Sequence, residues 1–268
     1  MTSIAHVLAV TLYLAAAAAA AVPLARPVRA PVGWVVRLLG AGFVVHATGL
    51  LTAARDSGQL PLTGLGPALS VAALLLALTL LAAELLAREV TLTLATAPLL
   101  AVATAAANVI GLHPAAGAEV AAGPWLMAHI AVSFVGIAAY GTAAAAGTMY
   151  LVEHRELKSR RFGALFRLFP PLDTLDRVNH IASVAGGIVL TLGLVLAVSY
   201  ALAFHGPDLP KLVWAFAAWV ALSAIALGRT VGTLRPRRAA LWTSLTFVAV
   251  IALYLAARAV AGHPGRFL

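Results

Sequence analysis

Long apolar stretches with almost no charge recur along the chain, and short polar segments separate them. Each stretch has about 20 residues, the length that an α-helix needs to cross roughly 30 Å of hydrocarbon. None alternates apolar and polar residues with a period of two, as the strands of a membrane barrel would. The pattern therefore predicts an all-α, polytopic transmembrane helix bundle of about eight spans. The expected spans are residues 4–24, 33–54, 66–87, 90–110, 125–152, 181–204, 212–228 and 240–261.

Basic residues collect in every second connection between these spans. Arg26 follows the first span and Arg235 precedes the last, whereas the connection at residues 111–124 contains neither Lys nor Arg. Lys and Arg accumulate in loops on the cytoplasmic side of membranes. The distribution therefore predicts that both termini are external, in a multi-pass protein of the bacterial inner (plasma) membrane. Because the N-terminus lacks the basic start of a secretory signal, we expect the first span to be retained.

Composition narrows the possible functions. Of 268 residues, 62% are hydrophobic and 10% are charged, and the mean hydropathy is +0.99. The net charge of +9 would face the anionic inner leaflet, so we expect membrane lipid as a partner and no nucleic acid. The absence of cysteine excludes thiol chemistry and covalent heme attachment to this chain. No catalytic motif stands out, and we predict that the protein is not an enzyme.

The most basic segment lies between the fifth and sixth expected spans. In residues 153–171, apolar residues such as Leu157 and Phe166 recur at helical spacing opposite Arg155 and Lys158, and prolines end the segment. This pattern predicts an amphipathic helix on the cytoplasmic surface. We expect two parts in the chain: an N-terminal four-helix transmembrane part (1–110) and a C-terminal part (111–268) that contains this segment.

Histidines are the main candidates for chemistry, because His129, His205 and His263 all lie near the external ends of spans. Neutral imidazole binds iron, copper or zinc, and two opposed imidazoles can hold heme iron. His129 and His263 have similar depth, so they would face each other if the fifth and eighth spans pack together. Alternatively, each could be a helix-end histidine that is hydrogen-bonded to water or carbonyl groups.

Three further residues have two interpretations each. His46 lies well inside a span, where a polar ring requires a partner; it could be a buried ligand or be hydrogen-bonded to a neighbouring helix. Trp214 could wall a planar ligand near the external turn, or belong to the interfacial aromatic belt. Lys211, with Asp208, could bind a charged ligand such as a propionate, or cap the turn.

From about residue 125 to residue 263, the chain resembles the cytochrome c assembly protein family, which includes the CcsA, CcmC, HemX and YpjD types. In that family a histidine early in one span precedes a Leu-Asp-Arg entry, a Leu-Thr-Leu-Gly span, an external segment ending in Trp-Asp-Pro-Lys, and a closing Leu-His-Ser. The matching positions here are Ala128–His129, Leu175–Asp176–Arg177, Leu190–Thr191–Leu192–Gly193, Asp208–Leu209–Pro210–Lys211 and Gly262–His263–Pro264.

The resemblance implies an integral membrane protein that binds or hands on heme in cytochrome c assembly. It implies that His129 and His263 ligate heme at the outer face, and Trp214 and Lys211 would line that site. A deeper heme would use His46, whose partner position corresponds to Gly228. Expected partners are membrane proteins that deliver heme or bind apocytochrome. The loop at residues 205–210 has no tryptophan, and this departure, with Gly228, favours the alternative: a HemX- or YpjD-like scaffold or regulator of tetrapyrrole metabolism that binds no heme.

Overall fold

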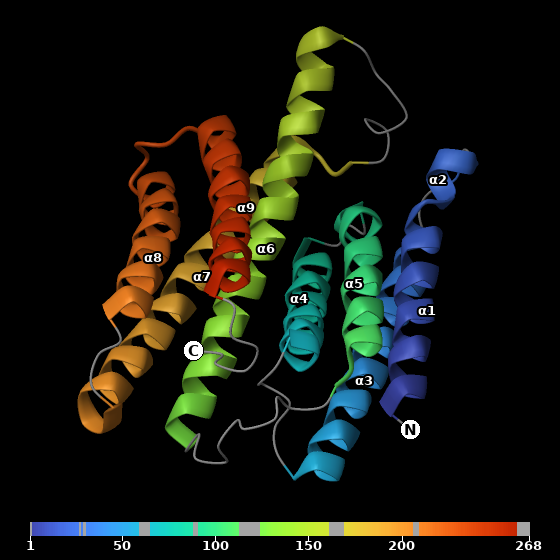
Figure 1. Ribbon diagram of the computed structural model, residues 1–268. Helices are drawn as coiled ribbons and strands as arrows, with labels where there is room; N and C mark the ends of the chain where they lie inside the picture. The colour runs from blue at the N-terminus through green and yellow to red at the C-terminus, as the bar shows by residue number, and fades with distance from the viewer. Residues whose placement is uncertain are drawn as a thin grey trace.

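The computed structural model describes residues 2–26, 28, 31–58, 65–87, 91–112, 124–160, 169–205 and 209–261. These residues form helices and no strand, which confirms the all-α prediction. Figure 1 shows the long helices side by side in one bundle. The helices are α1 (Thr2–Ala20), α2 (Val22–Ala25), α3 (Val32–Ser57), α4 (Leu65–Ala87), α5 (Thr91–Ile110), α6 (Pro124–Ser159), α7 (Leu172–Tyr200), the π-helical turn η1 (Ala201–His205), α8 (Leu209–Thr230) and α9 (Pro236–Ala261).

The helices have the lengths and composition of membrane spans. Within the described part of the chain, seven helices are long and apolar enough to cross a membrane: α1, α3, α4, α5, α6, α7 and α8. α9 has 26 residues and packs along α6, so the structure agrees with about eight spans. A multi-pass membrane protein follows from these helices.

Successive long helices run in opposite directions (Figure 1), so α1 begins and α9 ends at the same end of the bundle. The connections that carry Arg26 and Arg235 lie at the opposite end. We call the first the external end and the second the inner end, following the positive-inside rule. The alternation brings the start of α1 and the end of α9 to the same end of the bundle; that this end is external stays a prediction.

α1, α3, α4 and α5 form one group of helices around fully buried residues that include Tyr13, Leu39, Leu80 and Leu100. Small residues allow the helix backbones to approach closely, as is usual in membranes. A Cβ on Gly42 of α3, for example, would lie only 2.7 Å from Cε1 of the Tyr13 ring. α4 also packs against α6 and joins this group to the rest of the chain. The division at residue 110 stays a prediction.

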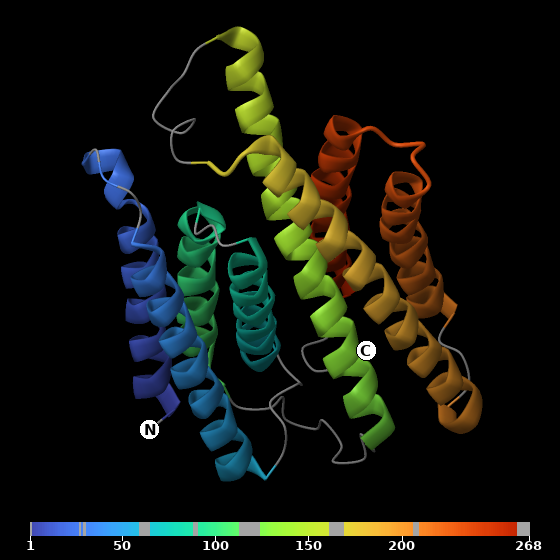
Figure 2. The same ribbon diagram turned by 180° about the vertical axis from the view of Figure 1, so that it is seen from behind.

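α6 is the central helix of the C-terminal part, and α7 crosses it on the face seen in Figure 2. A Cβ on Gly136 would lie 2.7 Å from Leu190, and one on Gly147 would lie 2.9 Å from the carbonyl oxygen of Ala240. Glycines thus bring α7 and α9 close to α6. The condition set by the sequence, that the fifth and eighth spans pack together, is met.

The basic segment differs from its prediction at its start. Residues 153–159 do not begin a separate surface helix but continue α6 without a break, since residues 150–159 contain neither Gly nor Pro to end it. α6 ends at Ser159, just before Arg160, whose φ is 53°, and projects beyond its neighbours at the inner end (Figure 1). Residues 161–168 of the expected amphipathic helix lie outside the described residues, and α7 begins directly after Pro171.

Candidate functional site

His129 lies near the external end of α6 and is held in one orientation by the neighbouring helix. Its Nδ1 is 2.8 Å from the backbone carbonyl oxygen of Gly193 on α7. A carbonyl can only accept a hydrogen bond, so Nδ1 carries a proton, and when the ring is neutral its lone pair is on Nε2. No residue that the structure describes hydrogen-bonds to Nε2. Metal-ligating histidines have this arrangement, in which a backbone carbonyl fixes one nitrogen and the other binds the metal.

The contact depends on a glycine at residue 193. Ser133, one turn along α6, has its Oγ 3.4 Å from His129 Nδ1, and a Cβ on Gly193 would lie 2.6 Å from that oxygen. Thr191, two residues earlier, accepts a 2.8 Å hydrogen bond from the indole N–H of Trp219 on α8. The Leu-Thr-Leu-Gly segment therefore fastens α7 to both α6 and α8 and orients His129. The sequence alone did not assign it this role.

The other residues of the expected outer site are described only in part. His263 lies outside the described residues, two positions after Ala261, where α9 ends at the external end. Lys211 belongs to the first turn of α8, and its side chain is not among those described. The Trp214 ring packs on Tyr254 of α9, with centroids 5.6 Å apart. An aromatic pair thus joins α8 to the part of α9 that leads to His263.

His46 belongs to a separate, fully buried polar cluster that joins α1, α3 and α4. Its Nε2 and the Nε2 of His6 are each 2.8 Å from Oγ of Ser70, and the two rings are 4.9 Å apart. Tyr13 Oη lies 3.2 Å from Nδ1 of His46, and Nδ1 of His6 lies 3.0 Å from the carbonyl oxygen of Thr2. Each of the four side chains is 0% exposed.

The carbonyl of Thr2 determines the direction of every hydrogen bond in this cluster when both rings are neutral. His6 must donate from Nδ1 to that carbonyl, so its Nε2 accepts from the Ser70 hydroxyl. Ser70 then accepts from Nε2 of His46, and Nδ1 of His46 accepts from Tyr13. Both nitrogens of His46 are therefore occupied, and iron ligation would require His46 to give up one of these bonds.

The structure does not bring His46 and Gly228 together, as a deep ligand pair would need. α3, which carries His46, packs against α1 and α4, whereas Gly228 lies near the inner end of α8 beside α7 and α9. The Gly228 carbonyl accepts hydrogen bonds from the Leu234 N–H (2.9 Å) and the Thr233 hydroxyl (2.9 Å). The partner of His46 is instead the Ser70–His6 pair. In the sequence, His6, His46 and Ser70 are polar residues within charge-free spans. That placement indicates that each needs a partner, but not that they contact one another.

The Leu-Asp-Arg entry has a structural role at the inner end. Leu175 is fully buried, and Asp176 forms an ion pair with Arg229 of α8, at 2.5 Å between carboxylate oxygen and guanidinium nitrogen. The two side chains are 20% and 24% exposed, respectively. This half-buried pair joins α7 to α8 at the end opposite His129.

His129 can be compared with what a bare metal ion and heme iron each require of a protein. The described residues contain no group of three or more His, Asp or Glu side chains that could hold a metal, whereas protein sites for bare transition metals usually need three or four ligands. Heme iron takes four ligands from the porphyrin and needs only one or two from the protein. An oriented histidine such as His129 meets this requirement.

Fold and site together define a multi-pass helical membrane protein with an oriented histidine near its external end. A family model described as "Cytochrome C assembly protein" matches residues 35–263, and the chain belongs to this family. A role in cytochrome c biogenesis follows from that membership. The match covers His46, His129 and His263 but begins after α1, so His6 and Tyr13 lie outside it. No curated protein matches the chain.

Proposed function

We propose that this protein binds heme at the external face of the bacterial inner membrane and holds it, or hands it on, during cytochrome c assembly. His129 and His263 would hold its iron, and Trp214 and Lys211 would line the site. The observation that carries the proposal is the hydrogen bond from His129 Nδ1–H to the Gly193 carbonyl. This bond orients the ring, and in the neutral form of the ring Nε2 is then the nitrogen that can bind a metal; pre-organisation lowers the cost of binding.

The rest of the chain supports this arrangement. α6 and α9 pack together, so the helix that carries His129 is adjacent to the helix that His263 follows in the sequence. The Trp214–Tyr254 pair offers an aromatic surface for a planar ring, and Lys211 would pair with a propionate. When bound, heme supplies an iron that can be carried to an acceptor. Because this chain has no cysteine, a partner must supply the thiols of any covalent attachment, and heme-delivery or apocytochrome-binding membrane proteins are the partners we propose.

His46 stands apart from this site as a second candidate ligand. It would bind iron only after exchanging its hydrogen bond to Ser70 or Tyr13 for the metal. In the proposed function heme therefore binds at the outer site before it binds at His46. Replacement of His46 by Ala leaves the outer heme in place.

The Soret absorption of the detergent-purified protein, made in cells with ample heme, tests the proposal. We expect a low-spin spectrum of bis-histidine ligation, which is lost in the variant carrying both His129→Ala and His263→Ala and is partly restored by added imidazole. His154→Ala, at the inner end of α6, is the matched control and keeps the spectrum. A colourless protein, together with a double variant that has no effect on cytochrome c maturation, would refute the proposal.

The Gly193 contact has a test of its own. The Gly193→Ala variant places a methyl group 2.6 Å from the Ser133 hydroxyl oxygen, so either the Ser133 hydroxyl turns to another rotamer or α7 moves away from His129. We expect heme occupancy to fall several-fold although both ligands remain. Adding Ser133→Ala removes the clashing oxygen and restores occupancy. Unchanged occupancy in Gly193→Ala would mean that this carbonyl does not orient the ligand.

A second function has one observation in its favour: the inner end of α6 projects from the bundle and carries Arg155 and Lys158. A scaffold or regulator of tetrapyrrole metabolism that binds no heme could dock a cytoplasmic enzyme on this basic end. Co-purification of such an enzyme, lost when Arg155, Lys158, Arg160 and Arg161 are replaced by Gln, together with a heme-free preparation, would favour this function over the first.

A further inference from the structure

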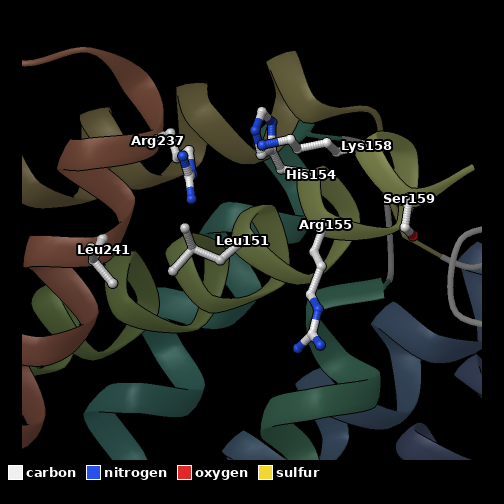
Figure 3. Close-up of a pocket in the computed structure, with 7 residues that line it drawn as sticks. All are labelled: Leu151, His154, Arg155, Lys158, Ser159, Arg237 and Leu241. Carbon is white, nitrogen blue, oxygen red and sulfur yellow. The ribbon is translucent and has the colours of Figure 1, made fainter.

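A cleft of about 530 Å³ opens at the inner end between α6 and α9. Its lining combines the apolar side chains of Leu151 and Leu241 with Ser159 and four basic residues: His154, Arg155, Lys158 and Arg237. In Figure 3, Arg237 extends from α9 over Leu151 of α6, while His154 and Lys158 lie together on the adjoining turn. The cleft lies at the opposite end of α6 from His129 and has no part in the proposed heme site.

The cationic groups of the cleft lack acidic partners. At 100° per residue, Glu153 and Glu156 lie on the side of α6 away from the cleft-lining Lys158. On α7, Asp176 is already paired with Arg229, and no salt bridge among the described residues joins Asp173 to a basic residue of the cleft. No salt bridge within the described part of the chain involves Lys158 or Arg237. An anion bound there would therefore meet net positive charge without a competing carboxylate.

Both walls change from apolar to cationic in the same direction. On α6, Lys158 lies seven residues, roughly 10 Å, closer to the cytoplasm than Leu151. On α9, which runs the other way, Leu241 lies four residues, about 6 Å, deeper in the membrane than Arg237. The apolar part of the cleft is thus on the membrane side and the basic part on the cytoplasmic side. A phospholipid has this same polarity, whereas a free phosphate would occupy only the basic part of the cleft.

We propose that this cleft is a binding site for an anionic phospholipid of the inner leaflet. The headgroup phosphate lies among His154, Lys158 and Arg237, and an acyl chain follows Leu151 and Leu241 toward the membrane interior. Basic clefts between membrane helices on the cytoplasmic side suit such headgroups, since the leaflet there is rich in anionic lipid. A bound lipid would join the inner ends of α6 and α9.

The test uses the full chain, delipidated in detergent and titrated with phosphatidylglycerol or with phosphatidylcholine of the same acyl chains, with bound lipid counted by native mass spectrometry. We expect phosphatidylglycerol to bind at least about tenfold more tightly. Each basic group near an anionic headgroup contributes a factor of about five in affinity. The double variant Lys158→Gln/Arg237→Gln should therefore bind phosphatidylglycerol about 30-fold more weakly.

The control variant Arg235→Gln/Arg238→Gln removes two charges from the same end of the bundle, but neither residue lines the cleft. We expect it to change the affinity for phosphatidylglycerol less than about threefold. An equal loss of affinity in both double variants would show only a general attraction between the basic surface and the lipid, and would overturn the proposal. A second titration uses inorganic phosphate in place of the lipid. If it stabilises the protein through Lys158 and Arg237 as well as the lipid does, the ligand is a free phosphate and the lipid assignment is wrong.

A third result concerns the docking alternative. If Lys158→Gln/Arg237→Gln leaves the phosphatidylglycerol affinity unchanged but abolishes co-purification of a cytoplasmic protein, the cleft belongs to a protein interface and the proposal fails. None of these measurements depends on heme, so the lipid site and the heme site can fail independently.

Discussion

Ser70→Ala tests the buried histidine cluster most directly, because a single hydroxyl group connects both rings. The substitution removes one oxygen atom with almost no change in volume, so it opens no significant cavity. It breaks the two 2.8 Å hydrogen bonds to His6 and His46. Both rings are 0% exposed, so water cannot replace the lost partner, and each ring keeps one buried nitrogen without a bond.

The expected loss follows from these two bonds. Side-chain hydrogen bonds between membrane helices contribute about 0.6 kcal/mol on average and at most about 1.7 kcal/mol. Two such bonds give a loss of about 1–3 kcal/mol in the free energy of unfolding. The upper half of this range is the better expectation, because leaving a buried polar group unsatisfied costs about 1–3 kcal/mol by itself.

Reversible unfolding in mixed micelles, followed by circular dichroism, measures this loss. Thr48→Ala is the matched control: Thr48 lies on α3 with His46, is exposed, and bonds only to the Val45 carbonyl of its own helix, so we expect about 0.5 kcal/mol or less. A double-mutant cycle with His46→Phe adds a second criterion, since Ser70→Ala should cost less once one of its two partners is gone. Equal losses for Ser70→Ala and Thr48→Ala, or strict additivity in the cycle, would refute the hydrogen-bonded cluster.

Two further substitutions test helix packing and the inner ion pair. Gly42→Ala should lower the free energy of unfolding by about 1–3 kcal/mol, because the new Cβ meets the Tyr13 ring at 2.7 Å. Gly40→Ala on the same helix is the control: its Cβ has no atom within 4 Å, so it should be neutral or stabilising by up to about 1 kcal/mol. Thermal unfolding in detergent compares the two variants, and equal melting temperatures would contradict the close contact of α1 and α3. Asp176→Asn keeps the shape of the side chain but removes the charge that pairs with Arg229. After discounting for partial exposure, we expect the free energy of unfolding to fall by about 1 kcal/mol, and by less at high salt. A loss that does not depend on salt would show that packing and not charge is involved.

Much of the fold could be predicted from the sequence because the membrane imposes it. Every backbone group in hydrocarbon must be hydrogen-bonded within the chain, so a charge-free run of about 20 residues has little choice but a helix. The positions of Arg26 and Arg235 predict the orientation in the membrane. The ends of α6 and α7 were harder to predict, since Glu, Arg and Lys favour a helix whether they lie in the membrane or project from it.

The candidate site was predicted less well, and for a physical reason. Depth in the membrane follows from counting residues, so His129 and His46 could each be assigned a level. Which helices touch at that level depends on small residues such as Gly193, whose effect is seen only when α6 and α7 are packed. For the same reason the contact of His46 with His6 could not be predicted. The family resemblance placed the partner of His46 at Gly228 instead.

α6 is one uninterrupted helix of 36 residues, and the candidate ligand His129 and the basic wall of the inner cleft are both part of it. At about 1.5 Å per residue, residues 129 and 155 are separated by roughly 39 Å along the axis, more than the thickness of the hydrocarbon core. No single small molecule can span that length. Because the helix is continuous, the proposed lipid site and the proposed heme site are kept at a fixed separation, at opposite ends of the bundle.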